Sequence, residues 1–88
     1  MPDIEIYTSP FCGYCGRAKG LLDSKGVAYR EIDTFMNGGK RREMSERAGG
    51  ATSVPQIFID GIHIGDSDKL QSLEAKGELD ALLGLAEG

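Results

Sequence analysis

The 88-residue sequence has no apolar run near the roughly 20 residues that a membrane-spanning helix requires. Residues 1–3 contain no basic stretch that leads into an apolar one, so we expect no secretory signal and a cytoplasmic protein. Positive charge is also in deficit, because the net charge is -4. Such a balance gives no general attraction to nucleic acid. We therefore expect neither a membrane nor a nucleic-acid partner.

Side chains that bind metals are scarce. The chain has two cysteines, Cys12 and Cys15, and one histidine, His63. A structural zinc ion needs four ligands, and His63 is far from both thiols in sequence, so we expect no zinc site. We expect His63 to be a surface side chain. Two cysteines separated by two residues, beside a strand–helix–strand pattern, instead indicate a dithiol/disulfide couple in a reducing compartment.

Composition and length set the domain organisation. Apolar residues make up 40% of the chain and charged residues 27%, which is typical of a folded globular protein. The sequence shows no internal repeat, linker or low-complexity tract. A chain of this size forms one hydrophobic core region, so we expect a single domain over residues 1–88.

Hydrophobic periodicity and turn residues predict the secondary structure. A first strand precedes the two cysteines, and the helix after them closes at Lys25 and Gly26. Asp60-Gly61 favours a tight hairpin turn, Asp66 or Ser67 is the candidate N-cap of the third helix, and a loop is expected at 33–39. The expected strands are residues 4–7, 27–32, 56–59 and 62–64, and the expected helices are 16–25, 40–48, 67–76 and 78–83.

The order of these elements predicts the fold. A strand, a helix and a strand in so short a length imply a right-handed crossover, so the first two strands should be parallel. The whole order, βαβαββα, predicts an α/β protein with a four-stranded mixed sheet flanked by helices, which is the thioredoxin-like arrangement. We expect Met44 and Ala48 to face inward from the second helix, and Met36 to pack in the interior rather than to serve a function.

Cys12 lies where the first strand ends and the first helix begins. The unpaired N–H groups of a first helical turn, together with the positive end of the helix dipole, stabilise negative charge on a sulfur placed there. The thiolate is the nucleophilic form of cysteine. Cys15 is one turn further into the helix and more shielded, so Cys12 is the expected attacking sulfur and Cys15 the resolving one. A purely structural disulfide closing so short a loop would stabilise little.

The motif Cys12-Gly13-Tyr14-Cys15, followed by Ala18-Lys19, resembles the active-site sequence of dithiol glutaredoxins. Three further segments agree with that family, in its order and spacing: residues 6–8, 53–59 and 64–68. The resemblance spans nearly the whole chain. It implies one glutaredoxin domain that uses glutathione as co-substrate.

The resemblance also implies a glutathione site. Pro55 would be cis and lie opposite the cysteines, which leaves the Val54 backbone free to pair with the cysteinyl unit of glutathione; a trans proline that merely starts a strand is the alternative. The backbone N–H groups of Ser67 and Asp68 would bind the γ-glutamyl carboxylate at a helix N-terminus, with the Asp68 carboxylate facing the ammonium group. Asp68 could equally serve as a capping carboxylate.

Two further contacts complete the implied glutathione site. Arg41 or Arg42, in the basic run that starts at Lys40, would bind the glycyl carboxylate; the alternative is that this run is a solvated face. Tyr14 would lie beside the reactive sulfur and shape the surface of the site.

Three positions depart from the family pattern. Ser9 stands where many members carry a lysine, Asp66 replaces a glycine, and Gly13 replaces the proline that commonly follows the first cysteine. Members without that proline include some that hold a [2Fe–2S] cluster between two subunits, bound by the first cysteine of each and two glutathione thiols. A simpler explanation is that glycine tolerates a turn at this position.

The resulting expectation is a monomeric glutathione-dependent thiol–disulfide oxidoreductase. It would reduce protein–glutathione mixed disulfides and protein disulfides through Cys12 and Cys15. The alternative is a homodimer that carries a glutathione-ligated [2Fe–2S] cluster, with Cys12 as the protein ligand. A third hypothesis is a thioredoxin-like donor reduced by a flavoprotein reductase.

Overall fold

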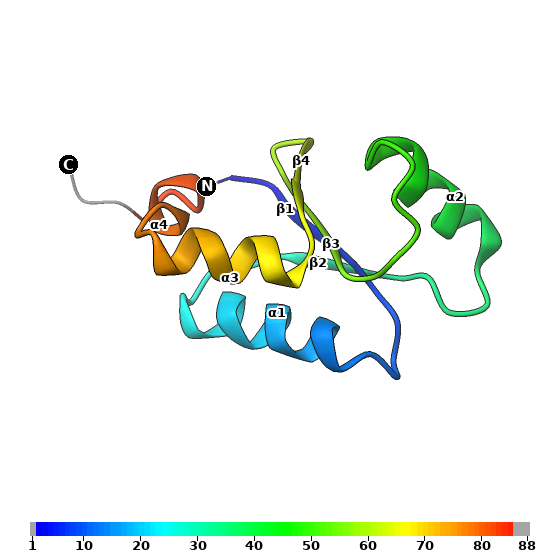
Figure 1. Cartoon of the computed structure of the whole chain (residues 1–88), viewed down its shortest axis with the longest axis horizontal. Coiled ribbons are helices and arrows are strands. Elements are labelled where there is room, and N and C mark those ends of the chain that lie inside the picture. The colour runs from blue at the N-terminus through cyan, green and yellow to red at the C-terminus, as the bar shows by residue number, and fades with distance from the viewer. Residues whose placement is uncertain (1, 86–88) are drawn as a thin grey trace.

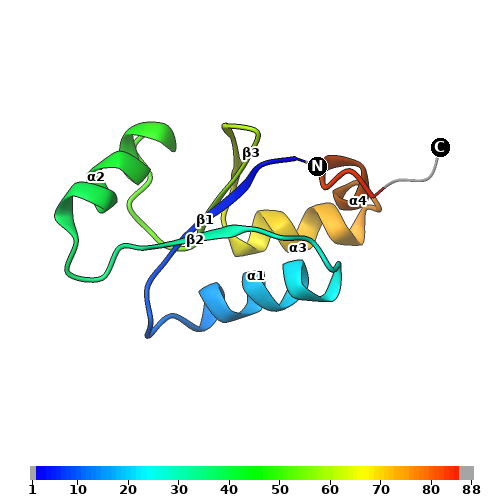
Figure 2. The ribbon, with the colours of Figure 1, turned by 180° about the vertical axis from the view of Figure 1, so that it is seen from behind.

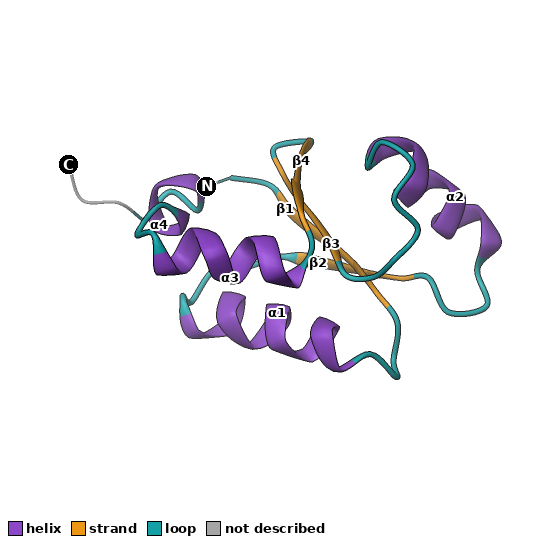
Figure 3. Ribbon diagram, in the orientation of Figure 1, coloured by secondary structure: helices purple, strands orange, loops and turns teal. Residues whose placement is uncertain are grey.

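The structure, a computed structural model, describes residues 2–85. Four strands form one sheet in the order β2-β1-β3-β4, and helices pack against it (Figures 1 and 3). The predicted element order and the mixed sheet are confirmed. The elements are β1 (Ile4–Thr8), α1 (Gly13–Ser24), β2 (Arg30–Asp33), α2 (Gly38–Arg47), β3 (Gln56–Ile59), β4 (Ile62–Gly65), α3 (Ser67–Ala75) and α4 (Leu79–Leu82).

Strand β1 is central in the sheet and determines where the site is built. It pairs parallel with β2, so that Thr8 and Asp33 are partners at the carboxyl end of both strands. On its other side it pairs antiparallel with β3, which continues antiparallel into β4. The chain segments that follow Thr8 and Asp33 therefore leave the sheet at the same edge. The N–H of Thr34 donates to the Thr8 carbonyl over 2.8 Å and holds these segments together.

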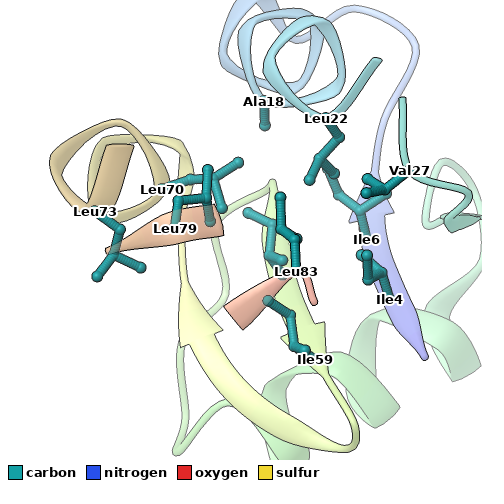
Figure 4. Close-up of a cluster of buried hydrophobic side chains, with 11 residues drawn as sticks. Ile4, Ile6, Ala18, Leu22, Val27, Ile59, Leu70, Leu73, Leu79 and Leu83 are labelled. Carbon is teal, nitrogen blue, oxygen red and sulfur yellow. The ribbon is translucent and has the colours of Figure 1, made fainter. Parts of the chain in front are cut away.

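The larger hydrophobic core lies between the sheet and helices α1, α3 and α4. Side chains alternate along a strand, so Ile4 and Ile6 of β1 point to this face. Helices α1 and α3 lie side by side on it, as the front and back views agree (Figures 1 and 2). Figure 4 shows the converging side chains, which belong to Ile4, Ile6, Ala18, Leu22, Val27, Ile57, Ile59, Leu70, Leu73, Leu79 and Leu83.

Helix α2 covers the opposite face with a much smaller apolar contact. Met44 and Ala48 are buried, as predicted, against Tyr7 and Phe58 of the sheet. A polar network supplements this contact, and no sequence pattern predicts it. Arg47 binds the buried Glu5 carboxylate at 2.8 Å and lies 4.1 Å above the Phe58 ring.

Three expected boundaries are wrong by two residues or more. Helix α1 begins at Gly13, not at residue 16, because the Cys12 sulfur accepts a hydrogen bond from the Cys15 N–H and caps the helix before Gly13. Strand β2 begins at Arg30, not at residue 27, because the chain turns at Gly26 (φ 70°) and directs Val27 into the core before strand pairing starts. Helix α2 begins at Gly38, not at residue 40. The Asn37 side chain accepts a hydrogen bond from the Lys40 N–H over 3.1 Å, so it caps the helix and draws two glycines into the first turn.

Other local predictions are confirmed. Asp66 is the N-cap of α3 and accepts a hydrogen bond from the Lys69 N–H over 3.0 Å. Asp60 and Gly61 both have positive φ, 53° and 80°, as a tight primed hairpin turn requires. The expectation that Met36 packs in the interior is wrong, because its side chain is 91% exposed. Across residues 2–85, none of the helices is long and apolar enough to span a membrane.

Candidate active site

Cys12 lies between strand β1 and helix α1 and is the N-cap residue of that helix. Its Sγ accepts a hydrogen bond from the backbone N–H of Cys15 over 3.3 Å. The sulfur is partly exposed and meets the positive end of the α1 dipole. This position combines access for a substrate with stabilisation of a thiolate, the two requirements of a nucleophilic cysteine.

Cys15 lies one turn deeper and is only 1% exposed. Burial raises the pKa of the Cys15 thiol to about 11, with a smaller contribution from its hydrogen bond with Cys12. Both cysteines are free thiols. The pair therefore consists of one accessible sulfur and one shielded, protonated thiol, an arrangement that suits an attacking and a resolving cysteine.

The segment before β3 lies opposite Cys12, as the family resemblance implied for Pro55. The Val54–Pro55 peptide bond is cis. The Cys12 thiol lies 3.5 Å from the Val54 carbonyl oxygen and donates to it. Strand pairing on β3 begins only at Gln56, so Val54 lies outside the sheet ladder.

A hollow of about 230 Å³ lies beside this contact. Five of the residues expected at the glutathione site contribute to its wall, and Asp66 and Ser53 join them. Ser67 is 1% exposed, and its hydroxyl has no hydrogen-bond partner among the described residues. Buried hydroxyl groups without a partner are rare in folded proteins, so this one is a candidate contact for a polar ligand. The wall consists of Tyr14, Ser53, Val54, Pro55, Asp66, Ser67 and Asp68.

The basic residues of α2 are placed differently. Arg41 does not line the hollow; its guanidinium donates to the Thr52 carbonyl at 3.3 Å and lies 3.5 Å from the Thr34 hydroxyl. It therefore borders the segment that leads into Ser53. Arg42 is exposed, and its side chain makes no hydrogen bond or ion pair with residues 2–85. Of the two candidates, the structure brings only Arg41 near the site.

Two residues at the site were not predicted from sequence. Gln56 is buried and donates from its side-chain nitrogen to the Ser53 carbonyl at 3.0 Å. Its side-chain oxygen lies 2.6 Å from Nε2 of the exposed His63. Ser53 itself lines the hollow; in the sequence it belongs to the family-like segment 53–59 but was given no role there. The Gln56 amide thus ties the segment opposite Cys12 to β4.

Gly13 lies in the first turn of α1, where a Cβ atom would meet nothing within 4 Å and φ is not positive. Neither close packing nor a positive φ therefore requires glycine at this position. No group of three or more His, Cys, Asp or Glu side chains suited to a metal ion occurs between residues 2 and 85.

Comparison with known proteins gives a consistent result. Residues 4–64 match the family model described as glutaredoxin. The chain is 54% identical over 83 residues to glutaredoxin 3 of Escherichia coli strain K12, covering 94% of this chain and 99% of that one. The solution structure of glutaredoxin from Brucella melitensis superimposes with a TM-score of 0.83 at 48% identity, covering 100% of this chain and 95% of that one.

A glutaredoxin structure solved as a complex with a ligand is also similar. The crystal structure of a buckwheat glutaredoxin–glutathione complex matches with a TM-score of 0.84 at 29% identity, covering 94% of this chain and 77% of that one. The thioredoxin-like fold is thereby confirmed. The chain belongs to the glutaredoxin family, whose members are thiol–disulfide oxidoreductases that use glutathione.

Proposed function

We propose that this protein is a glutathione-dependent oxidoreductase that reduces protein–glutathione mixed disulfides and protein disulfides. One observation carries the proposal: the partly exposed Cys12 sulfur caps helix α1 and faces the Val54 carbonyl beside the hollow, with the Cys15 thiol buried behind it. This arrangement provides a nucleophile, a resolving thiol and a place for the substrate. We infer that the protein acts as a monomer in a reducing cytoplasm, where free glutathione supplies the electrons.

For a glutathionylated protein, the Cys12 thiolate attacks the glutathione sulfur of the mixed disulfide. The S–S bond of the mixed disulfide breaks, the protein leaves as a thiolate that takes up a proton, and Cys12 forms a new disulfide with glutathione. A second glutathione thiolate attacks the glutathione sulfur of that bond. Oxidised glutathione leaves, and the Cys12 thiolate is restored.

For a protein disulfide, the Cys12 thiolate attacks one substrate sulfur and forms a mixed disulfide. Cys15 loses its proton and attacks the Cys12 sulfur, which releases the substrate as a dithiol and leaves a Cys12–Cys15 disulfide. Two glutathione molecules reduce that bond and leave as oxidised glutathione. A potential of about -200 to -230 mV, the range of glutaredoxins, permits exchange with the glutathione pool.

We place glutathione in the hollow beside Cys12. The Val54 carbonyl accepts the thiol hydrogen of Cys12 in the free protein, and Cys12 loses that hydrogen when it reacts, so the carbonyl can then accept an N–H of the cysteinyl unit. The backbone N–H groups of Ser67 and Asp68 at the start of α3 bind the γ-glutamyl carboxylate, and the orphaned Ser67 hydroxyl supports a polar ligand at this end. The Asp68 carboxylate then faces the ammonium group.

The remaining contacts fall to Tyr14 and Arg41. Tyr14 contributes to the wall of the hollow, 56% exposed, where its ring can cover the bound disulfide. Pro55 closes the wall opposite. Arg41 binds the glycyl carboxylate. To do so, its guanidinium gives up a weak contact with the neutral Thr34 hydroxyl and gains a stronger one with an anion.

Steady-state reduction of a glutathionylated peptide, with glutathione as reductant, tests the proposal. Wild type and Cys15→Ser should both release the peptide thiol, whereas Cys12→Ser should show no rate above the uncatalysed reaction. Reduction of a protein disulfide should require both cysteines. Peptide release at the wild-type rate by Cys12→Ser would overturn the assignment.

The cluster-bridged homodimer remains the alternative function. Each chain offers one partly exposed thiol, Cys12, as a ligand, and Gly13 leaves open space beside it. Purification without oxygen in the presence of glutathione separates the two functions. A colourless monomer that reduces the peptide supports the enzyme, and a coloured dimer supports the alternative.

A further inference from the structure

Three large apolar side chains are exposed around the candidate nucleophile. Phe11, which directly precedes Cys12, is 88% exposed, Phe35 is 47% exposed and Met36 is 91% exposed. The rings of Phe11 and Phe35 form an edge-on pair with centroids 5.9 Å apart. We call these three side chains the apolar patch. Isolated exposed apolar residues are normal on a protein surface, but a group beside a nucleophile indicates an interaction site.

The topology of the sheet brings the patch together. Phe11 follows the end of β1, and Phe35 and Met36 follow the end of β2, so both segments leave the same edge of a parallel strand pair. Two hydrogen bonds from Thr34 to the Thr8 carbonyl fix the second segment against the first. The Phe35 N–H bonds to the Asp33 carboxylate over 2.8 Å and orders the turn. The patch is therefore built on the fold rather than on a loose loop.

The backbone at Met36 is unfavourable for its side chain. Its φ of 52° is in the left-handed region, which glycine occupies at no steric cost and other residues occupy rarely. Burial does not compensate, because the side chain is almost fully exposed. A methionine at such a position gains nothing from the fold of the isolated chain. A partner that covers it would account for the residue.

The size of the patch decides between occupants. None of its residues lines the hollow, so glutathione bound there would leave the patch uncovered. Each of these three side chains can bury a surface area of at most about 150–250 Å². That total is below the roughly 800 Å² per partner of a stable protein interface, so a permanent dimer through this patch is not favoured. A transient contact with the polypeptide that carries the target cysteine fits both the area and the position next to Cys12.

We propose that the apolar patch binds the polypeptide part of the substrate, and that it favours substrates with a large apolar side chain next to the cysteine that is reduced. This inference rests on the proposed function and names the substrate class of the same site. Glutathione fills the hollow while the flanking apolar side chain of the substrate packs against Phe11, Phe35 and Met36. The thioether of methionine adapts its shape to different partners, which suits a surface that meets several substrates.

The test compares two glutathionylated peptides that differ only in the residue before the cysteine, leucine in one and serine in the other. A third substrate, the mixed disulfide of glutathione and 2-mercaptoethanol, has no polypeptide. The variant is the double substitution Phe11→Ser and Met36→Gly. The glycine matches the positive φ of Met36, and both side chains are exposed, so the melting temperature should not fall. Ile62→Ser is the matched control.

Ile62 is 66% exposed and lies far from the nucleophile. It pairs with Ile59, and Ile59 pairs with Ile4 at the start of β1, whereas Cys12 follows the end of that strand. Wild type and Ile62→Ser should show kcat/KM about tenfold higher for the leucine peptide than for the serine peptide, as partial burial of a leucine allows. In the double variant the ratio should fall to about twofold or less. The rate with the small mixed disulfide should stay within about twofold.

Each alternative outcome has a distinct meaning. Equal kcat/KM for both peptides with wild type would overturn the patch inference and leave the proposed function intact. A wild-type dimer in sedimentation that the double variant abolishes, with unchanged peptide preference, would assign the patch to a second copy of the chain and also overturn the inference. Lack of turnover of the small mixed disulfide by wild type would overturn the proposed function and this inference with it.

Discussion

The backbone N–H of Cys15 donates a hydrogen bond to Sγ of Cys12 over 3.3 Å, and this bond is also the N-cap bond of helix α1. The candidate nucleophile thus satisfies one of the four unpaired N–H groups at the start of the helix. Its sulfur has two roles, one in chemistry and one in the stability of the fold. Two substitutions that both remove the thiol can separate these roles, because a serine hydroxyl is a preferred N-cap acceptor and alanine has none.

We expect Cys12→Ser to unfold at nearly the wild-type temperature and Cys12→Ala to unfold at a lower one. Loss of the cap should reduce the free energy of unfolding by about 1 kcal/mol, which corresponds to roughly 4–8 °C for a domain of this size. Thermal unfolding of the reduced proteins, followed by circular dichroism, measures the difference. Equal melting temperatures for the two variants would show that the cap contributes nothing.

Cys15 should resist alkylation in the folded protein at neutral pH. Because its pKa is raised to about 11, the thiol is protonated below that pH, and at pH 8 only about one molecule in a thousand carries the reactive thiolate. Treatment of the native protein with iodoacetamide at pH 8 should add one group, on Cys12, and treatment in denaturant should add two. Mass spectrometry of the intact protein gives the count, with Cys15→Ser as the control that takes one group in both conditions. Rapid double modification of the native protein contradicts the assignment.

Ser67→Ala should make the free protein more stable and weaken its binding of the substrate. The Ser67 hydroxyl is buried without a hydrogen-bond partner among the described residues, and such a group costs about 1–3 kcal/mol. Its removal should raise the melting temperature of the free protein. If the hydroxyl contacts the γ-glutamyl group, the KM for glutathionylated peptide should rise about fivefold, the factor of one typical hydrogen bond. An unchanged KM would remove Ser67 from the proposed site.

Helix α1 contains more glycine than its conformation needs. At Gly16 and Gly20 a Cβ atom would meet nothing within 4 Å, and neither has a positive φ. Alanine at either position should therefore stabilise the protein by about 0.5–1 kcal/mol. Gly65 is the contrasting position, because its φ is 141° and a Cβ would lie 2.8 Å from the Lys69 side chain.

Chemical denaturation of Gly16→Ala, Gly20→Ala and Gly65→Ala tests this contrast. The midpoint should increase for the first two variants and decrease for the third, with unchanged slopes. The close approach at Gly65 positions the N-cap Asp66 and hence the start of α3, so Gly65→Ala should also weaken substrate binding. A destabilised Gly16→Ala would indicate that the exposed face of α1 has a contact not visible in the isolated chain.

Local patterns in the sequence were enough to predict the fold. The alternation in residues 4–7 places Ile4 and Ile6 on one face of β1 and Tyr7 on the other, and the structure has this division. Gly26 and the Asp60-Gly61 pair form turns because of their own backbone conformations, so these turns can be predicted from the local sequence. Asn37 shows the limit. Its capping bond outweighs the poor helix propensity of two glycines, and propensity alone predicts a loop there.

Features that depend on residues distant in sequence could not be predicted. Glu5 belongs to a strand with alternating character, yet it is buried because Arg47 reaches it from α2. The isolation of the Ser67 hydroxyl and the pairing of Phe11 with Phe35 likewise exist only after the chain has folded. The site residues Val54, Ser67 and Asp68 came from family resemblance, and the structure places all three around one hollow.

Helix α2 is joined to the sheet through a cluster of four buried residues, whereas eleven form the cluster on the other face. Regions with few buried apolar contacts open locally at a lower free energy than the whole molecule unfolds. The amide hydrogens of α2 should therefore exchange with solvent faster than those of α1 and α3, while the rest of the fold stays closed. Arg41 lies on α2, and Phe35 and Met36 lead into it. Part of the surface proposed to meet the substrate thus belongs to the least protected region of the molecule, which can adjust without disturbing the helix that Cys12 caps.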